Sequence, residues 1–192
     1  MPSAHHSQGG GPGARKARGD AAKGRVAWTR GGLDQASLER LAGVVAQAAR
    51  RGDALLLTGD LGAGKTTFAR AFIRARGAQA GEPVAEVPSP TFTLVQQYEL
   101  ATGTVWHFDL YRIEDPSELV ELGLDEALAG GIALIEWPER MGAAAPAARI
   151  DLALAYEADP DTRTLTVTDM TGDGHIAAAL DAAQGRVVWT RG

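Results

Sequence analysis

The sequence contains no cysteine and no asparagine, and only three of its 19 basic residues are lysines. The lack of cysteine excludes disulfide bonds, thiolate nucleophiles and cysteine-based zinc sites. No stretch approaches the roughly 18 consecutive apolar residues of a membrane-spanning helix. The first 24 residues also lack the apolar segment of a secretory signal. These absences favour a cytoplasmic protein.

Charge is distributed unevenly along the chain. The net charge is −5, but residues 1–25 hold five basic residues and one acidic residue, so residues 26–192 carry −9. This negative charge on residues 26–192 argues against broad nucleic-acid binding by the folded part of the chain. Residues 1–24 are rich in glycine, and we expect them to form a disordered tail. An RNA contact through their basic residues is the alternative.

Apolar periodicity places short strands and helices in alternation along residues 25–192. The runs "ALLLT" at 54–58 and "IALIEW" at 132–137 are typical of buried parallel strands. Further strands are expected at 24–30, 91–100, 104–109, 149–156 and 163–169. We expect helices at 33–51, 65–76, 115–122, 124–131 and 175–183, with Gly52, Gly77 and Gly123 ending the first three.

These elements predict a single α/β domain over residues 25–192. Its sheet should be mixed and mostly parallel, flanked by helices. The two alternating segments around Asp159-Pro160-Asp161 should form an antiparallel hairpin at one edge. The stretch "GRVAWTRG" at 24–31 recurs as "GRVVWTRG" at 185–192, and two edge strands of similar design are one interpretation.

A glycine loop follows the apolar run at 54–58. Its residues Gly59, Asp60, Leu61, Gly62, Ala63, Gly64, Lys65 and Thr66 fit the pattern G-x-x-x-x-G-K-[ST], and Thr67 follows. In this pattern backbone amides surround phosphates, lysine reaches the β- and γ-phosphates and the hydroxyl binds Mg²⁺. Lys65 is also the one lysine outside residues 1–24, so a chain that otherwise uses arginine keeps a compact charge there. The loop, placed between a buried strand and a helix, predicts a P-loop NTPase-like domain that binds a nucleotide with Mg²⁺, and Thr67 can contact the α-phosphate side.

Two acidic residues follow apolar strand segments, Asp109 after "TVWHF" and Glu136 after "IALI". Ligands bind at the carboxyl ends of parallel strands in open α/β sheets. We assign Glu136 to the Mg²⁺ shell and Asp109 to orienting water or to a second-shell position, although either acid could ligate the metal directly. We expect His107 to lie on the opposite side of its strand from Asp109 and to be packed, with a role as catalytic base as the alternative. Trp137 either stacks on the base or stiffens the turn.

The segment "VPSPTFTLVQQYE", 87–99, places three hydroxyl residues beside a strand, as in switch loops that order around a γ-phosphate. The absence of asparagine excludes the Asn-Lys-x-Asp reader of guanine-specific switches. Two classes of protein remain as alternatives to an ATPase. One is a small-molecule kinase, and the other is a nucleotide-gated adaptor without essential hydrolysis.

Four segments together resemble the TsaE (YjeE) family, in its order and at its spacing. They are "GDLGAGKTTFAR", "PSPTFTLVQQYE", "HFDLYRIEDPSELVELGLDE" and "ALIEWPER". The resemblance covers about residues 33–156. It implies a small ATPase that supports threonylcarbamoylation of the tRNA adenosine next to the anticodon by acting on a TsaB–TsaD complex.

The resemblance also implies roles for individual residues. Thr66 and Glu136 match the family's Mg²⁺ positions, Asp109 matches its acid in H-x-D-x-Y-R, and Trp137 matches the tryptophan beside the site. The segment 29–37 should face the adenine. Catalysis is expected from Asp109, Lys65 and Glu136. No residue is an obvious arginine finger, so we expect weak hydrolysis by the isolated chain and completion of the site by a partner, with Arg112 as the in-chain alternative. We expect a monomer that meets tRNA only through the TsaB–TsaD complex.

Overall fold

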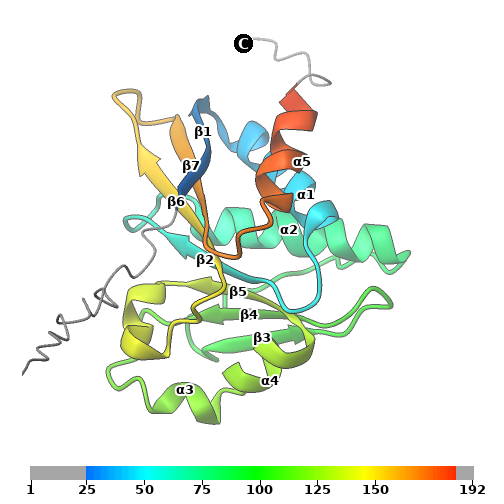
Figure 1. Cartoon of the computed structure of the whole chain (residues 1–192), viewed down its shortest axis with the longest axis vertical. Helices are drawn as coiled ribbons and strands as arrows, with labels where there is room; N and C mark the ends of the chain where they lie inside the picture. Colours follow the sequence, from blue (N-terminus) through cyan, green and yellow to red (C-terminus); the bar gives the residue numbers. More distant parts are fainter. Residues whose placement is uncertain (1–24, 185–192) are drawn as a thin grey trace, which may run out of the picture.

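A seven-stranded mixed sheet forms the centre of the computed structural model, which describes residues 25–184 (Figure 1). Its strands are β1 (Arg25–Leu33), β2 (Ala54–Thr58), β3 (Val95–Tyr98), β4 (Val105–Asp109), β5 (Ile132–Glu136), β6 (Ile150–Tyr156) and β7 (Arg163–Asp169). Their order across the sheet is β1-β7-β6-β2-β5-β4-β3. Only β7 and β3 run against the other five, so the prediction of a mixed, mostly parallel sheet is confirmed.

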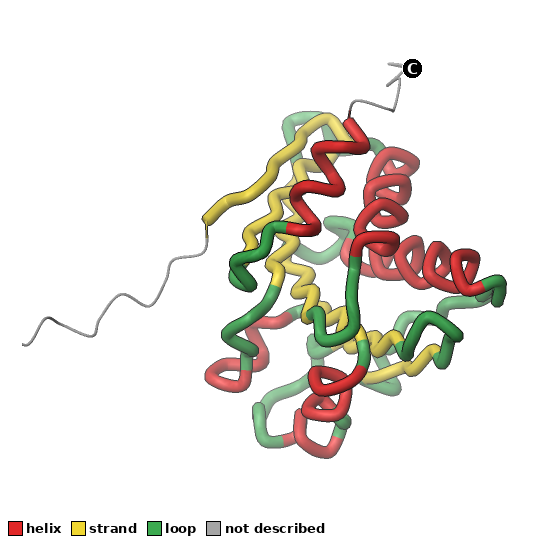
Figure 2. Tube along the Cα trace, turned by 45° about the vertical axis from the view of Figure 1, so that its right-hand side comes forward, coloured by secondary structure: helices red, strands yellow, loops and turns green. Residues whose placement is uncertain are grey.

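Helices cover both faces of this sheet (Figures 1 and 2). One face carries α1 (Gln35–Ala48), α2 (Lys65–Ala80) and α5 (His175–Gln184). The other carries α3 (Glu118–Glu121), α4 (Leu124–Gly130) and the 3₁₀ segment η1 (Pro138–Ala144). Because β2, β4 and β5 are buried on both faces, their residues are apolar almost without alternation.

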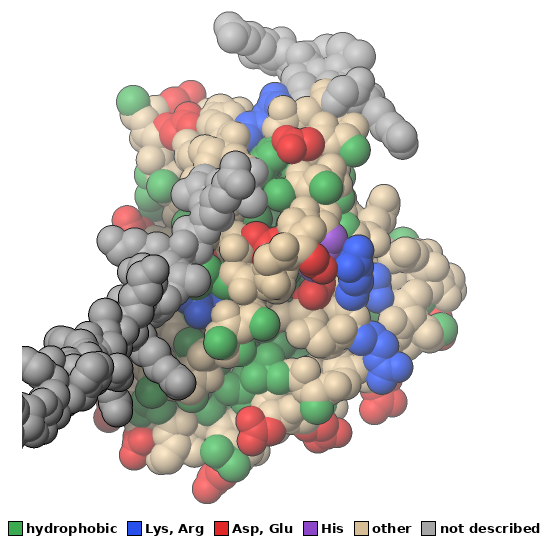
Figure 3. Space-filling view, in the orientation of Figure 1, with side chains coloured by type: hydrophobic (Ala, Val, Ile, Leu, Met, Phe, Trp, Pro, Cys, Tyr) green, Lys and Arg blue, Asp and Glu red, His purple; other side chains and the backbone are tan. Residues whose placement is uncertain are grey.

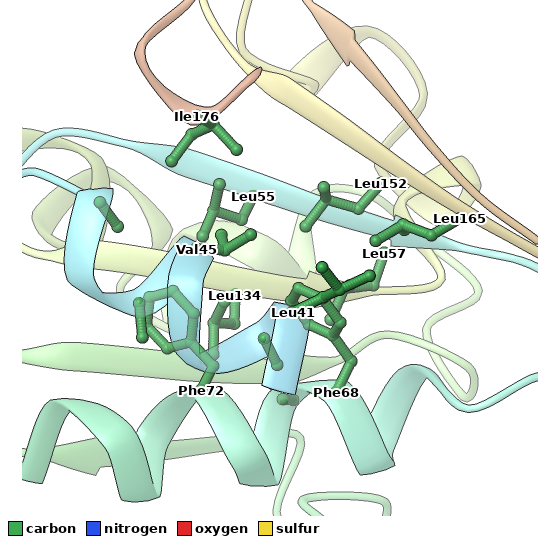
Figure 4. Close-up of a cluster of buried hydrophobic side chains, with 14 of the residues drawn as sticks. Leu41, Val45, Leu55, Leu57, Phe68, Phe72, Leu134, Leu152, Leu165 and Ile176 are labelled. Carbon is green, nitrogen blue, oxygen red and sulfur yellow. The ribbon is translucent and has the colours of Figure 1, made fainter. Parts of the chain in front are cut away.

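The larger core lies between the sheet and the helices α1, α2 and α5. Leu41 and Val45 of α1 pack with Phe68 and Phe72 of α2 against one face of the sheet (Figure 4). The sheet contributes leucines from β2, β5, β6 and β7, and α5 contributes Ile176. This packing fixes the first turn of α2 against the carboxyl ends of the central strands.

Two expectations are wrong, one about the position of a hairpin in the sheet and one about the end of a helix. The β6–β7 hairpin does not lie at an edge, because β1 pairs with β7 and covers it. The edge hairpin is instead β3–β4. Helix α2 continues through Gly77 to Ala80 and ends at Gly81, whose φ is 75°. Gly77 is required for another reason: a Cβ there would lie 2.6 Å from the carbonyl oxygen of Glu82.

Two smaller boundaries also differ from expectation. Helix α1 ends at Ala48, with Ala49 as its C-cap, before reaching Gly52, and β3 begins only at Val95, after a turn. Gly123 does end α3, as predicted, and it also begins α4.

Both ends of the chain lie outside the described residues. The predicted tail at 1–24 and the second copy of the near-repeat, 185–192, therefore receive no structural account, whereas the first copy forms most of the edge strand β1. Within residues 25–184, no helix has the length and apolar character needed to cross a membrane. Acidic side chains are spread over the face shown in Figure 3, and the basic ones lie mostly along its right-hand side.

Candidate functional site

The glycine loop joins the carboxyl end of β2 to the first turn of α2. Gly59, Gly62 and Gly64 have φ values of 136°, 78° and 107°, a region that glycine enters at little cost. A Cβ at Gly59 would collide with the carbonyl oxygen of Leu154, and one at Gly64 would lie 2.9 Å from Leu38. Gly64 caps α2 without a side-chain hydrogen bond, so the first amides of α2 have no capping side chain. A helix start of this kind is suited to binding an anion.

Lys65 is 4% exposed, and its ammonium turns back onto the glycine loop. Nζ donates to the carbonyl oxygens of Gly59, at 2.6 Å, and Asp60, at 2.9 Å. It also lies 3.8 Å from the ring centroid of Trp137. Burial lowers the pKa of Lys65, and the charges of Glu136, Glu139, Asp109 and Asp60 oppose that effect. The lysine is thus a buried cation whose hydrogen-bond acceptors are two neutral carbonyl oxygens. The charged oxygens of a phosphate would be stronger acceptors and would replace them.

Glu136 and Asp109 lie side by side at the carboxyl ends of β5 and β4. They are direct partners in the parallel register, so both carboxylates point to the face covered by α2. Thr66 Oγ1 donates to Glu136 Oε2 at 2.8 Å. Glu136 is 2% exposed and Asp109 is 4% exposed. The two acids predicted from strand ends are therefore brought together, and of the two, Glu136 contacts Thr66.

Asp109 binds the segment interpreted as a switch loop. Its Oδ2 accepts a hydrogen bond from Thr91 Oγ1 at 2.8 Å, and Ser89 is hydrogen-bonded to Thr91 in turn at 2.8 Å. The third hydroxyl of the segment, that of Thr93, accepts a hydrogen bond from Gln96 at 3.0 Å and does not line the site. Of the three predicted hydroxyls, Thr91 therefore contacts the acid directly, and Ser89 is linked to it only through Thr91.

A cleft of about 280 Å³ opens between the glycine loop and these acids. Lys65, Thr66, Thr91, Asp109 and Glu136 line it, together with Leu61, Gly62, Gly64, Thr67, Tyr111 and Trp137. Trp137 has a φ of 59°, and its ring lies 5.0 Å from that of Tyr111. In this structure Trp137 therefore faces the lysine and Tyr111 beside the cleft.

A second cleft of about 340 Å³ adjoins the first through Gly62, Gly64 and Thr67. Leu33, Asp34, Gln35 and Leu38 line one side, within the segment expected to face adenine or next to it. The opposite side comes from the β6–β7 turn, with Pro160, Asp161 and Arg163. Sequence reasoning missed this turn, because nothing local indicates that it lies beside the start of α1.

The placement predicted for His107 is wrong. Residues two positions apart on a strand share a face, so His107 and Asp109 point the same way. The ring of His107 is fully buried, and its Nε2 lies 2.8 Å from Glu136 Oε1. Sequence reasoning also missed Tyr156, whose hydroxyl donates to the carbonyl oxygen of Leu61 at 3.1 Å.

The two clefts form one surface with distinct chemistry at each end. The first offers helix amides, an ammonium, several hydroxyls and two carboxylates. Oxygen ligands such as those of Thr66 and Glu136 suit Mg²⁺, which usually takes one or two protein ligands and completes its shell with phosphates and water. A Cβ at Gly59, Gly62 or Gly64 would collide with a neighbouring residue, so the loop has this path only with glycine at these positions. These residues fit a metal–phosphate group.

Known proteins resemble this chain over much of its length. The model of the family described as "Threonylcarbamoyl adenosine biosynthesis protein TsaE" matches residues 33–165. A tRNA threonylcarbamoyladenosine biosynthesis protein TsaE from Bacillus subtilis is 40% identical over 129 residues, 67% of this chain and 77% of that protein. The protein of the same name from Rickettsia felis is 46% identical over 101 residues, but the match spans only 53% of this chain and 57% of the relative.

A solved structure shares the fold. The crystal structure of Bacillus subtilis YdiB superposes with a TM-score of 0.65 at 28% sequence identity, covering 82% of this chain and 95% of that one. The match to the family model covers more than half of this chain and contains both carboxylates and the glycine loop. The chain belongs to the TsaE family of threonylcarbamoyl adenosine biosynthesis proteins.

Proposed function

We propose that this chain is a cytoplasmic Mg²⁺-dependent ATPase that supports threonylcarbamoyladenosine formation in tRNA by acting on a TsaB–TsaD complex. One observation carries the proposal: Lys65 and Thr66 begin α2 directly opposite the paired carboxylates of Glu136 and Asp109. Family membership supplies the tRNA context.

ATP would lie across both clefts. Its phosphates would bind the glycine loop and the first amides of α2, and Lys65 would exchange its two carbonyl acceptors for phosphate oxygens. Adenosine would extend past Thr67 into the second cleft, between Asp34 and the β6–β7 turn. Mg²⁺, when bound by Thr66 and Glu136, would neutralise charge on the phosphates.

Hydrolysis needs a positioned water and a stabilised leaving group. Asp109 would orient a water molecule for attack on the γ-phosphorus, as the bond to the bridging oxygen breaks and ADP leaves. The proton of the water passes to phosphate or, through Asp109, to solvent. Lys65 would stabilise the charge that develops on the phosphate oxygens.

A partner is proposed to complete the catalytic site. Of the described residues lining the first cleft, Lys65 is the one basic side chain. Arg112, the in-chain candidate for a further cation, is exposed and lies over the ring of Phe92 at 5.5 Å. We therefore expect slow turnover by the isolated monomer and faster turnover when TsaB–TsaD covers the cleft.

The test is ATP turnover by the full chain, alone and with TsaB, TsaD and tRNA, alongside mass analysis of the tRNA nucleosides. We expect the partners to raise ATP turnover and threonylcarbamoyladenosine to form only with ATP. If the isolated chain hydrolyses ATP at its full rate and the partners do not change that rate, the proposal that a partner completes the catalytic site is wrong. Transfer of labelled γ-phosphate to a metabolite would identify a kinase instead, and modification that survives loss of hydrolysis would identify an adaptor.

A further inference from the structure

A fully buried imidazole lies directly beneath the proposed Mg²⁺ carboxylate. His107 is in the middle of β4, with Val105 and Asp109 on the same face of the strand, and its ring is inaccessible to solvent. Its Nε2 is 2.8 Å from Glu136 Oε1 on the neighbouring strand. No step of the proposed hydrolysis uses this ring.

The hydrogen bonds of His107 define its tautomer. A carboxylate only accepts hydrogen bonds, so Nε2 carries the proton that is donated to Glu136. The other nitrogen, Nδ1, is buried and has no hydrogen-bond partner among the described residues. A buried N–H without an acceptor is costly, so Nδ1 is the nitrogen without a proton. The ring is therefore a one-sided donor aimed at Glu136.

Glu136 is held at both oxygens. Oε1 accepts from His107, and Oε2 accepts from Thr66 at 2.8 Å. This pair of contacts fixes a side chain that otherwise has several rotamers, and it turns Oε2 toward the hydroxyl at the start of α2. A leucine would fill the position of His107 without an unpaired polar nitrogen, but it would leave Oε1 without a donor.

We propose that His107 is a positioning residue, which holds the Glu136 carboxylate so that Oε2 is presented to Mg²⁺ beside Thr66. The inference rests on the proposed function and adds to it a residue that touches neither nucleotide nor metal. Groups that hydrogen-bond a metal-binding side chain typically change metal affinity or activity by 10- to 100-fold when they are removed.

The test compares three variants by titrating a fluorescent ATP analogue in EDTA and in Mg²⁺, with thermal unfolding of each protein. His107→Leu keeps the volume and removes the donor, and His107→Gln keeps an amide donor at similar reach. Val105→Ala is the matched control, because Val105 is equally buried on the same face of β4 and pairs with Ile132, at the other end of β5 from Glu136.

We expect Mg²⁺ to tighten binding of the analogue to the wild-type chain, and His107→Leu to lose about 10-fold or more of that gain. Its affinity in EDTA should stay within about twofold of wild type, because the glycine loop is unchanged. His107→Gln should restore most of the gain. Val105→Ala should melt earlier yet keep the full response to Mg²⁺.

A wild-type response to Mg²⁺ in His107→Leu overturns the inference and leaves the proposed function standing. A wild-type chain whose ATP affinity ignores Mg²⁺ overturns both. If His107→Leu does not fold, ¹⁵N NMR of histidine-labelled wild type and Glu136→Ala decides. The inference requires an Nε2-protonated ring whose Nε2 signal moves when the carboxylate is removed, and an unmoved signal contradicts it.

Discussion

At the scale of single residues, the site separates two carboxylates that look equivalent in the sequence. Both follow apolar strand residues, and both are almost completely buried. Glu136 contacts the Thr66 hydroxyl, whereas Asp109 contacts Thr91 of the 87–99 segment. The different neighbours predict different roles.

Glu136→Gln should therefore impair mainly Mg²⁺-dependent ATP binding, and Asp109→Asn mainly the rate of hydrolysis. Glu136→Gln should remove most of the Mg²⁺-dependent gain in ATP affinity, because an amide is a weaker metal ligand than a carboxylate. Asp109→Asn should bind Mg²⁺–ATP nearly as wild type does and hydrolyse it about 10²- to 10⁴-fold more slowly. Binding titrations and single-turnover hydrolysis measure the two effects. Loss of the Mg²⁺ response in Asp109→Asn would instead make Asp109 the direct ligand.

At the scale of secondary-structure elements, the glycine loop is braced by a neighbouring strand. Tyr156, at the end of β6, donates to the carbonyl oxygen of Leu61, and Arg163 of β7 lies 4.0 Å from its ring. The same hairpin supplies the turn that lines the second cleft. The β6–β7 hairpin thus contacts both proposed halves of the nucleotide site.

Gly62→Ala should weaken ATP binding. The alanine would have to keep a φ of 78°, and its Cβ would lie 2.7 Å from the Tyr156 hydroxyl. A left-handed conformation costs about 1–2 kcal/mol in a non-glycine residue, so we expect a loss of about tenfold in affinity. Gly81→Ala is the control, since its φ is 75° with no atom within 4 Å of the Cβ. It should lower stability without changing ATP affinity, as measured by unfolding and nucleotide titration.

The docking of α5 should depend on pH. His175 begins α5, and its two ring nitrogens bond to Asp173 and to Asp53, which precedes β2. Burial alone would lower the pKa of His175, but the two carboxylates outweigh it and raise the pKa above its usual value. The hydrogen bond to His175 lowers the pKa of Asp173 to about 2. Arg50 pairs with Asp173 at 3.2 Å and completes the charged groups there.

A group with a raised pKa stabilises the fold below its unfolded pKa of about 6.5 and loses that contribution as pH rises through the folded value. The free energy of unfolding should therefore fall between pH 6 and pH 8, roughly, and His175→Gln should flatten this slope. Urea unfolding at several pH values measures it. An equal slope in the variant would assign the pH dependence to other groups.

At the scale of the whole molecule, apolar side chains are exposed at the mouth of the first cleft. Leu61 is 78% exposed, Phe92 is 86% exposed and Tyr111 is 48% exposed. Leu61 and Tyr111 line the cleft, and Phe92 follows Thr91, which also lines it. Apolar groups around a functional opening favour a partner that covers it.

Phe92→Ser should lower the stimulation of ATP turnover by TsaB–TsaD several-fold and leave the turnover of the isolated chain unchanged. Val120→Ser is the matched control, because Val120 is 71% exposed on α3 and lines neither cleft. Steady-state hydrolysis at increasing partner concentration separates the variants. An equal loss of stimulation in Phe92→Ser and Val120→Ser would contradict a specific contact between the partner and Phe92.

The sequence by itself determined the glycine loop, the strands that end in Asp109 and Glu136 and the family resemblance. Each depends on residues close together in the chain, where glycine conformation and apolar runs leave a direct signal. The tertiary structure decided which groups meet: Asp109 with Thr91, Glu136 with His107, and the β6–β7 turn with the start of α1. Strand order and side-chain contacts follow from long-range packing, which also overrides local rules, as at Gly77 within α2.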